Sequence, residues 1–308
     1  MKSVEISVVS PVYKGEAFVE ELVARCESTL KQICDSYEVI LVEDCGPDRS
    51  WEKILQICKS NPKVRGLRLS RNYGQQYALQ AGLDASCGDH VVTLDCDLQD
   101  RPEEIISLYE KAKTGYDIVA AKRGNRKDGA FKRYASRVFY QLMSYLTETN
   151  QDPSVANFVL YSRRAVDAMA QIGDYRRYYP ILPQLIGFDY ATVVVNHAER
   201  PEGNSSYSIK ARFNLAVDTI LNFSNKPLRL AVKFGVLLSF LSISVALILV
   251  GLYASGNIQV KGWTSLALLV SFFSGAIISV LGMVGLYVGQ IFESVKNRPS
   301  YIVKESLN

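Results

Sequence analysis

The chain has 308 residues, of which 48% are hydrophobic, and its formal net charge at pH 7 is only +4. This length accommodates one large domain and a smaller, more apolar part. The nearly balanced charge argues against a nucleic-acid partner, because nucleic-acid-binding proteins gather basic residues on one face. The 6 cysteines form no C-x-x-C pair and His90 and His197 lie far apart, so neither disulfides nor a zinc site are expected.

Short β-branched stretches alternate with helical patterns over the first part of the chain. Strands are predicted at "ISVVSPVY", "YEVILVED", "VRGLRLS", "HVVTLD" and "DIVAA", with helices between them near residues 17–33, 51–59, 75–85 and 102–114. This alternation predicts an α/β fold with a doubly wound, mostly parallel sheet and helices on both faces. Ligands of such sheets bind beyond the carboxyl ends of the strands, so the residues that follow the strands are the candidates for a site.

The C-terminal third contains two long uncharged stretches, residues 234–260 and 263–292. Each exceeds the roughly 20 residues that cross a bilayer core, which predicts two transmembrane helices. Basic residues flank their outer ends, whereas the connection holds only Lys261, and this asymmetry favours cytoplasmic outer ends. We therefore expect a multi-pass inner (cytoplasmic) membrane protein whose N-terminal domain and both termini are cytoplasmic, and the absence of a signal-peptide pattern agrees with this expectation.

Apolar side chains recur at helical spacing in residues 209–227, just before the first uncharged stretch. This pattern predicts an interfacial helix that lies along the membrane surface. Packing of the same helix on the N-terminal domain is an equal alternative. In either case the helix would bring the carboxyl edge of the sheet near the bilayer.

Charged side chains follow the predicted strands. Asp44 follows the second strand, Asp95 and Asp97 follow the fourth, and Arg123 follows the fifth. Two carboxylates one residue apart, at the end of a buried strand, repel each other unless a cation lies between them. Oxygen ligands without histidine suit Mg²⁺ or Mn²⁺ that is shared with substrate phosphates. These residues therefore predict a site for a divalent cation and a phosphorylated ligand at the carboxyl edge of the sheet.

One further acid has a structural interpretation. Asp100 is followed by Pro102 and Glu103, a spacing typical of a helix N-cap with a first-turn proline and a capping box. Asp48, which precedes the second helix, is interpreted in the same way. We therefore expect Asp100 to begin a helix and not to belong to the site.

Several segments, in this order, resemble one enzyme family. "SPVYKGE", "VEDCGPDRS", "SRNYGQQYALQAG" and "LDCDLQD" resemble the catalytic domain of family 2 inverting glycosyltransferases, whose fold is of the glycosyltransferase A type. "HAERPEGNSSYS" and "GLYVGQIFESVKNRPSYIV" resemble the R-x-x-G-x-S-x-Y loop and the second membrane helix of the subgroup that glycosylates polyprenyl phosphates such as bactoprenol and dolichol phosphate. "RNYGQ" and "HAER" are similar to the aminoarabinose branch, but no segment identifies the sugar.

The resemblance implies transfer of a sugar, with inversion, from a nucleotide diphosphate sugar to polyprenyl phosphate, and UDP-sugars are favoured over GDP-sugars. The implied ligands of Mg²⁺ or Mn²⁺ are Asp95, Asp97 and Gln99. The implied contacts of the nucleotide sugar are Pro11, Tyr13, Glu16, Asp44, Asp95, Ser205 and Tyr207. Asp97 and Arg200 are implied to be catalytic, because they would stabilise the departing diphosphate.

The sequence departs from the family pattern at one place. Many relatives carry D-x-G-D-F where this chain reads "QDPSVANF", so that Ser154 and Asn157 replace the two acids and Asp152 lies two residues earlier. Asn157 is neutral and cannot act as a base, but a phosphate monoester has a second pKa of about 6 and is already anionic near neutral pH. We expect Asp152 and Asn157 at the catalytic centre, where Asp152 orients the acceptor, substitutes for the missing acid, or only shapes the turn before a proline.

The segment "KRGNRKDGAFKRYASR", residues 122–137, is strongly basic. Because the same chain contains predicted membrane helices, anionic lipid is a better partner than nucleic acid. We assign Arg123, Arg133 and Arg137 to the acceptor phosphate, since a guanidinium binds phosphate through two parallel hydrogen bonds. Arg126, Lys127 and Lys132 are assigned to lipid head groups.

These interpretations divide the chain into four parts: a catalytic domain (1–208), an amphipathic juxtamembrane helix (209–230), two transmembrane helices (231–292) and a cytoplasmic tail (293–308). We also expect a homo-oligomer. Three alternatives stay open: a family 2 transferase with another membrane acceptor, such as a diacylglycerol lipid or a growing polysaccharide; a catalytically inactive membrane scaffold; and a channel or transporter subunit. Uncharged spans argue against transport, and the retention of Asp95, Asp97 and Arg200 argues against a scaffold.

Overall fold

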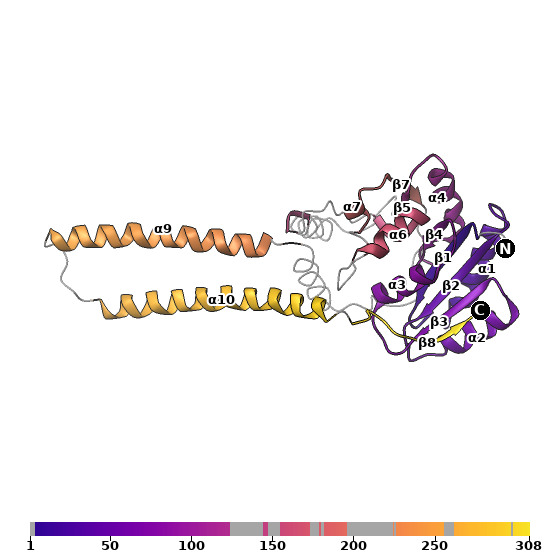
Figure 1. Cartoon of the computed structure of the whole chain (residues 1–308), viewed down its shortest axis with the longest axis horizontal. Helices are drawn as coiled ribbons and strands as arrows, with labels where there is room; N and C mark the ends of the chain where they lie inside the picture. Colours follow the sequence, from indigo (N-terminus) through magenta and orange to yellow (C-terminus); the bar gives the residue numbers. More distant parts are fainter. Residues whose placement is uncertain are drawn as a thin grey trace. The chain divides into compact units, whose positions relative to one another are not determined.

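The chain folds as two compact units, shown in the computed structural model of Figure 1. One unit contains a β-sheet with its helices, and the other contains two long helices. The structure describes residues 4–123, 144–146, 155–172, 179, 182–195, 224, 226–255, 262–296 and 298–308. Each unit is described by itself.

The described part of the first unit contains one sheet with strand order β7-β5-β6-β4-β1-β2-β3-β8. The strands are β1 (Ile6–Val12), β2 (Tyr37–Glu43), β3 (Val64–Leu69), β4 (His90–Thr93), β5 (Ile118–Arg123), β6 (Val155–Ser162), β7 (Tyr190–Val195) and β8 (Val303–Leu307). β1 pairs in parallel with β2 and β4, β2 with β3, and β5 with β7, whereas β6 and β8 run antiparallel to their neighbours. The predicted α/β fold with a mostly parallel sheet is confirmed.

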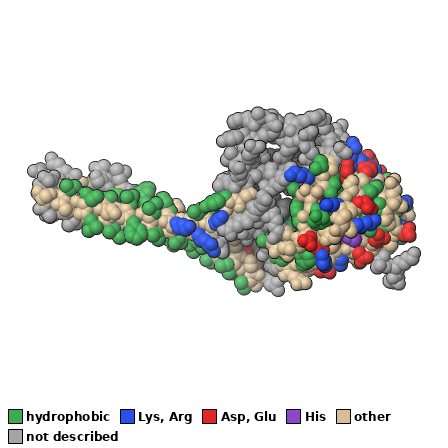
Figure 2. Space-filling model, turned by 90° about the horizontal axis from the view of Figure 1, so that it is seen from above, with side chains coloured by type: hydrophobic (Ala, Val, Ile, Leu, Met, Phe, Trp, Pro, Cys, Tyr) green, Lys and Arg blue, Asp and Glu red, His purple; other side chains and the backbone are tan. Residues whose placement is uncertain are grey.

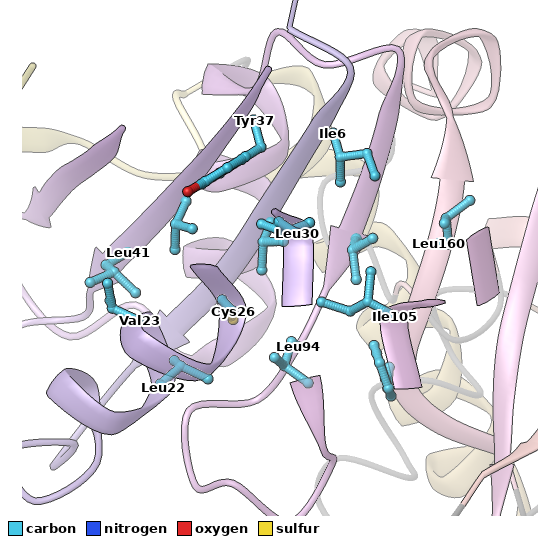
Figure 3. Packing of buried hydrophobic residues seen from close by; sticks show 14 of the residues in the cluster. Ile6, Leu22, Val23, Cys26, Leu30, Tyr37, Leu41, Leu94, Ile105 and Leu160 are labelled. Carbon is cyan, nitrogen blue, oxygen red and sulfur yellow. The ribbon is translucent and has the colours of Figure 1, made fainter. Parts of the chain in front are cut away.

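Helices cover both faces of this sheet (Figure 1). They are α1 (Val19–Leu30), α2 (Ser50–Ser60), α3 (Gln75–Ala85), the 3₁₀ turn η1 (Pro102–Glu104), α4 (Ile105–Ala112), α6 (Arg163–Gln171) and α7 (Leu182–Ile186). Successive strand residues point to opposite faces, so Val8 packs in the cluster beneath α1, α2 and α4, while Val9 packs beneath α3, α6 and α7. Figure 3 shows the first cluster, in which Leu22 and Leu30 of α1 and Ile105 of α4 cover the sheet.

Helix α3 approaches the sheet very closely at a glycine. A Cβ atom added to Gly82 would lie 2.2 Å from Cγ1 of Val9 in β1, a distance that no real side chain could adopt. The absence of a side chain therefore lets α3 lie directly on the centre of the sheet. This contact fixes the helix that begins at the candidate site.

The capping box predicted at Asp100 is wrong. The residue that precedes η1 is Arg101, and no side chain caps this turn. The Glu103 carboxylate instead accepts hydrogen bonds from Nε and Nη2 of Arg25, at 2.9 and 2.8 Å, and so joins η1 to α1. The helix begins with a 3₁₀ turn one residue later than the capping pattern indicates, and Asp100 is only 1% exposed.

The last residues of the chain form an edge strand that the sequence analysis did not anticipate. β8 pairs antiparallel with β3, with Arg68 opposite Glu305 and Gly66 opposite Leu307. The Asn308 amide donates to the carbonyls of Cys58 and Val64, at 3.0 and 2.8 Å, which secures the end of the strand. Residues after the second long helix therefore belong to the sheet unit.

The second unit contains α9 (Lys226–Ala254) and α10 (Trp263–Val295). Both helices are long and apolar enough to cross a membrane, as predicted, over Lys226–Val245 and Phe272–Val295. Figure 2 shows apolar side chains covering the long helices, whereas charged side chains gather on the sheet unit. Near the start of α9, the Tyr287 hydroxyl of α10 donates to the Ser224 carbonyl at 2.8 Å. Most of the predicted interfacial helix lies outside the described residues.

Candidate active site

The loops that follow β1, β2 and β4 meet at the carboxyl edge of the sheet. A Cβ atom added to Gly46, after β2, would lie 3.4 Å from the backbone nitrogen of Lys14, after β1. A Cβ atom added to Gly15 would lie 3.4 Å from Sγ of Cys96, after β4. The three predicted strand ends therefore form one continuous region, as expected for a doubly wound sheet.

Each of these three loops contains a non-glycine residue with a left-handed backbone. The φ angles are +55° at Lys14, +50° at Cys45 and +58° at Leu98. Asn308, at the end of the chain, is the remaining non-glycine residue of this kind in the described part. A strained backbone residue costs about 1–3 kcal/mol and such residues cluster at functional sites. Their position marks this edge as the candidate active site.

Asp95 lies at the centre of the acidic part of the site. Its Oδ1 accepts a hydrogen bond from Nε2 of Gln75, the first residue of α3, at 2.7 Å. Its carboxylate also accepts a hydrogen bond from the side chain of Asn157 in β6. Burial, followed by the nearby carboxylates of Asp100 and Asp97, raises the pKa of Asp95 to about 6. Burial and the two neighbouring carboxylates therefore both disfavour the ionised form of this side chain.

Asp97 and Gln99 continue the same turn. The Gln99 backbone N–H donates to Oδ1 of Asp97 at 3.2 Å, around the left-handed Leu98. Both side chains are half-buried. With Asp95 they offer oxygen ligands beside the carboxylate of Asp100, which fits a hard divalent cation. No group of three or more His, Cys, Asp or Glu residues in the described part is arranged to hold a metal, so substrate phosphates or water would have to complete the coordination.

Asp44 anchors a loop on the nucleotide side of the predicted site. Its two carboxylate oxygens accept the backbone N–H groups of Tyr73 and Gly74, at 2.7 and 2.8 Å. The Asn72 amide donates to the Asp44 carbonyl at 3.1 Å. Burial raises the pKa of Asp44, and the two N–H groups oppose this rise. The carboxylate therefore holds the turn that leads into α3.

The exit of β1 carries the remaining described residues of the predicted nucleotide site. Pro11 is buried within β1, whereas Tyr13 is 46% exposed. Glu16 exchanges hydrogen bonds with the loop before α2: its N–H donates to Asp48 at 3.0 Å, and its carboxylate accepts the Arg49 N–H at 3.2 Å. Glu16 thus braces two loops, and Tyr13 presents an aromatic face beside them.

Comparison with known proteins identifies the family. The family model described as "Glycosyl transferase family 2" matches residues 7–169. The chain belongs to this family. It is 34% identical, over 99% of its length and 95% of the relative, to the "Uncharacterized glycosyltransferase YkcC" of Bacillus subtilis (strain 168). It is 33% identical, over 98% of its length and 94% of the relative, to the "Undecaprenyl-phosphate 4-deoxy-4-formamido-L-arabinose transferase" of Photorhabdus laumondii subsp. laumondii.

A solved structure supports the fold of this glycosyltransferase. Glucosyl-3-phosphoglycerate synthase from Mycobacterium tuberculosis, in complex with Mn²⁺, uridine diphosphate and phosphoglyceric acid, superposes with a TM-score of 0.51. The sequences are 18% identical, and the match covers 71% of this chain and 77% of the synthase. The predicted glycosyltransferase A-type fold and the resemblance to the polyprenyl-phosphate subgroup are confirmed by these comparisons.

The remaining predicted site residues of the glycosyltransferase are only partly described. The backbone of Arg123 ends β5 and pairs with Val195 of β7. Residues outside the described part are Arg133, Arg137, Asp152, Arg200, Ser205 and Tyr207. Their predicted roles stay predictions.

Sequence reasoning missed two residues of the acidic region. Gln75 stood in a motif that carried the family resemblance, but nothing in the motif indicated that its amide reaches Asp95. Asp100 was interpreted as a helix cap, although its carboxylate contributes to the raised pKa of Asp95. The signal that could have identified Asp100 is its place at the end of the same turn, five residues after Asp95.

Proposed function

We propose that this glycosyltransferase moves a sugar from a nucleotide diphosphate sugar to polyprenyl phosphate at the cytoplasmic face of the membrane, with inversion at the anomeric carbon. The observation that carries the proposal is a match over 98% of the chain, including both apolar helices, to relatives named as undecaprenyl-phosphate transferases. The alignment thus includes the membrane segments as well as the sugar-transfer domain.

The donor would bind at the carboxyl edge of β1, β2 and β4. Tyr13 offers an aromatic face to the nucleobase, and Asp44 fixes the neighbouring loop. Asp95, Asp97 and Gln99 would hold Mg²⁺ or Mn²⁺, which when bound would stabilise the negative charge of the departing diphosphate. The fold neighbour was solved with Mn²⁺ and uridine diphosphate, which supports the proposal that this chain uses a divalent cation and a UDP-sugar. Arg200, Ser205 and Tyr207 would contact the diphosphate from a loop outside the described residues.

The acceptor phosphate would reach the anomeric carbon from the side opposite the diphosphate. Its anionic oxygen forms the new C–O bond while the bond to the diphosphate breaks, which inverts the configuration. The amide of Asn157 accepts no proton, and it lies at the carboxylate cluster. This neutral residue supports a reaction in which the acceptor is already ionised and no strong base is needed. Arg123, Arg133 and Arg137 would bind the acceptor phosphate.

The membrane arrangement is proposed to be a hairpin with both ends in the cytoplasm. β8 follows α10 in the chain and pairs with β3, which precedes α9. If α9 and α10 cross a membrane, this pairing requires the chain to enter and leave it on the same side. The basic residues at the outer ends of the two helices favour the cytoplasmic side.

The test is a transfer assay on the full-length protein in detergent. Undecaprenyl phosphate and diacylglycerol are each incubated with UDP-glucose, UDP-N-acetylglucosamine, UDP-4-deoxy-4-formamido-L-arabinose or GDP-mannose, and lipid products are identified by mass spectrometry. We expect a sugar-phosphate lipid from undecaprenyl phosphate and one of the UDP-sugars, and no product from diacylglycerol. A glycosylated diacylglycerol alone would establish the alternative acceptor.

The same assay tests the cation. Excess chelator and Asp97→Asn should each reduce transfer by more than about 100-fold, because the departing diphosphate loses its counter-charge. Glu110→Gln is the matched control, since this exposed carboxylate of α4 accepts a hydrogen bond from Lys113 at 2.9 Å. Full activity in excess chelator would refute the cation site without affecting the assignment of the acceptor.

A further inference from the structure

Asp95 receives amide hydrogen bonds from two elements that are distant in the sequence. Gln75 donates from the first turn of α3 at 2.7 Å, and Asn157 donates from β6. β6 lies beside β4, with Val159 opposite Thr93, and the Thr93 hydroxyl donates to the Asn157 carbonyl at 2.9 Å. The carboxylate is therefore oriented by a helix and by the neighbouring strand.

The backbone that precedes Gln75 is held in place by hydrogen bonds. Gly74, with φ of +98°, directs the chain into α3, and its N–H is bound by the Asp44 carboxylate at 2.8 Å. Tyr73 and Asn72 add further hydrogen bonds to Asp44. The turn before Gln75 is thus tied to the end of β2, while its amide reaches the end of β4.

The body of α3 is fixed as well. Gly82, two turns after Gln75, lies against Val9 of β1 with no space for a side chain. β1 is the strand between β2 and β4. Groups on rigid elements hold a site more accurately than groups on loops. The Gln75 amide therefore has a defined place relative to the carboxylate.

An amide suits this position because it orients the carboxylate without neutralising it. An ionised carboxylate has about four lone-pair positions, so two amide donors leave others for a cation. A lysine or arginine at the same place would cancel part of the charge that attracts the cation. The two neutral donors therefore preserve both the charge and the binding capacity of Asp95.

We propose that Gln75 is a positioning residue that orients the Asp95 carboxylate for a divalent cation, together with Asn157. The inference rests on the proposed function, because it takes Asp95 as a ligand of that cation. Gln75 touches neither the cation nor the sugar in this role and acts through Asp95. Partners that orient metal ligands in this way typically change metal affinity by about 10- to 100-fold when they are removed.

The test compares Gln75→Leu with Gln76→Leu in the full-length protein. Gln76 is the matched control, because it is the next residue of α3 and its Oε1 accepts the Tyr179 N–H at 3.2 Å. Binding of Mn²⁺ alone is measured from the loss of the free-ion signal in electron paramagnetic resonance, which requires no sugar donor or acceptor. We expect the Mn²⁺ dissociation constant to rise about 10- to 100-fold in Gln75→Leu and to stay near the wild-type value in Gln76→Leu.

A second variant tests whether the effect of Gln75→Leu arises from misfolding. Gln75→Asn keeps an amide but shortens the side chain by one methylene, so its donor no longer reaches Asp95, and the same loss of Mn²⁺ affinity is expected. Wild-type affinity in either Gln75 variant, or an equal loss in Gln76→Leu, would overturn the inference. A wild-type protein that binds no Mn²⁺ would overturn the inference and the proposed cation site together. A protein that binds Mn²⁺ normally but makes no polyprenyl-linked sugar would refute only the proposed acceptor.

Discussion

The carboxylate of Asp44 accepts the backbone N–H of Gly74 at 2.8 Å and so ties the end of β2 to the start of α3. The second oxygen accepts the N–H of Tyr73 at 2.7 Å. Asp44 as a whole is only 2% exposed. Asp44 therefore organises the loop beside the proposed donor site.

Asp44→Ala should destabilise the sheet unit, because the N–H groups of Tyr73 and Gly74 would lose their acceptor. Leaving a buried donor unsatisfied costs about 1–3 kcal/mol. We expect a loss of this size in the free energy of unfolding, followed by near-ultraviolet circular dichroism, and weaker binding of UDP in calorimetry. Asp84→Ala is a control carboxylate, since it is exposed and bonds Tyr301 at 2.9 Å. Unchanged stability with a tenfold loss of UDP affinity would show instead that Asp44 acts mainly on the nucleotide.

The sequence was sufficient to predict the central strands and their carboxylates. Buried parallel strands are continuous apolar runs, and the residue after each run necessarily lies at the carboxyl edge, which placed Asp44, Asp95 and Asp97 together. The sequence was not sufficient to predict the place of Asp100. A local capping pattern predicted that a helix begins at this residue, whereas a 3₁₀ turn begins after Arg101. Nor could it reveal Gln75, whose partner is decided by the packing of α3 on β1 and not by neighbours in sequence.

The edge strand β8 was missed for a different reason. Its five residues, Val303–Leu307, include Lys304 and Glu305, so no apolar alternation distinguishes them from a polar tail. Edge strands commonly carry charged residues that prevent pairing with other chains. The strand also depends on β3, which is distant in the sequence, and such pairings leave no local signal.

Deleting residues 301–308 should destabilise the sheet unit. β8 contributes four paired positions to β3, and each net hydrogen bond contributes about 0.5–1.5 kcal/mol. We expect the free energy of unfolding to fall by at least about 2 kcal/mol and the exposed β3 edge to promote aggregation, measured by light scattering. A synthetic peptide, "YIVKESLN", should restore stability in trans, whereas a scrambled peptide should not.

Glu305→Gln is the matched control for this deletion. Glu305 lies 3.5 Å from Nη1 of Arg68, and its side chain is 41% exposed. An exposed ion pair contributes at most about 1 kcal/mol, so this variant should stay close to the wild type. Equal destabilisation by the substitution and the deletion would assign the effect to the ion pair and not to strand pairing.

The pH dependence of stability should include a contribution from His90. Burial lowers the pKa of His90 from its ordinary value, and its Nδ1 has no hydrogen-bond partner in the described part of the chain. The imidazole is therefore protonated more readily in the unfolded state, so its contribution to stability is present above about pH 6.5 and is lost as the pH falls. His90→Gln should lose less stability than the wild type between pH 7 and pH 5 in thermal unfolding. Parallel pH profiles of the two proteins would contradict this assignment.

Asn157 provides the most direct test of why an amide replaces an acid beside Asp95. Its side chain hydrogen-bonds the Asp95 carboxylate, which already lies near Asp97 and Asp100. In Asn157→Asp a second carboxylate would face Asp95, and two such groups at one site repel each other strongly when both are ionised. The protein without cation should therefore unfold at a lower temperature, and Mn²⁺ should raise that temperature more than in the wild type, because the cation relieves the repulsion.

Asn157→Leu should have the opposite effect on the response to Mn²⁺. This variant removes the donor without adding charge, so Asp95 is less well oriented and the cation-induced rise in unfolding temperature should be smaller than in the wild type. For a domain of this size, about 1 kcal/mol corresponds to a shift of roughly 2–4 °C, which thermal unfolding resolves. Transfer by Asn157→Asp should not exceed the wild-type rate, since an ionised acceptor phosphate needs no added base. A faster Asn157→Asp enzyme, or a Mn²⁺-induced rise that exceeds the wild-type rise in both variants or falls below it in both, would mean that this position supplies a base and not a neutral hydrogen bond.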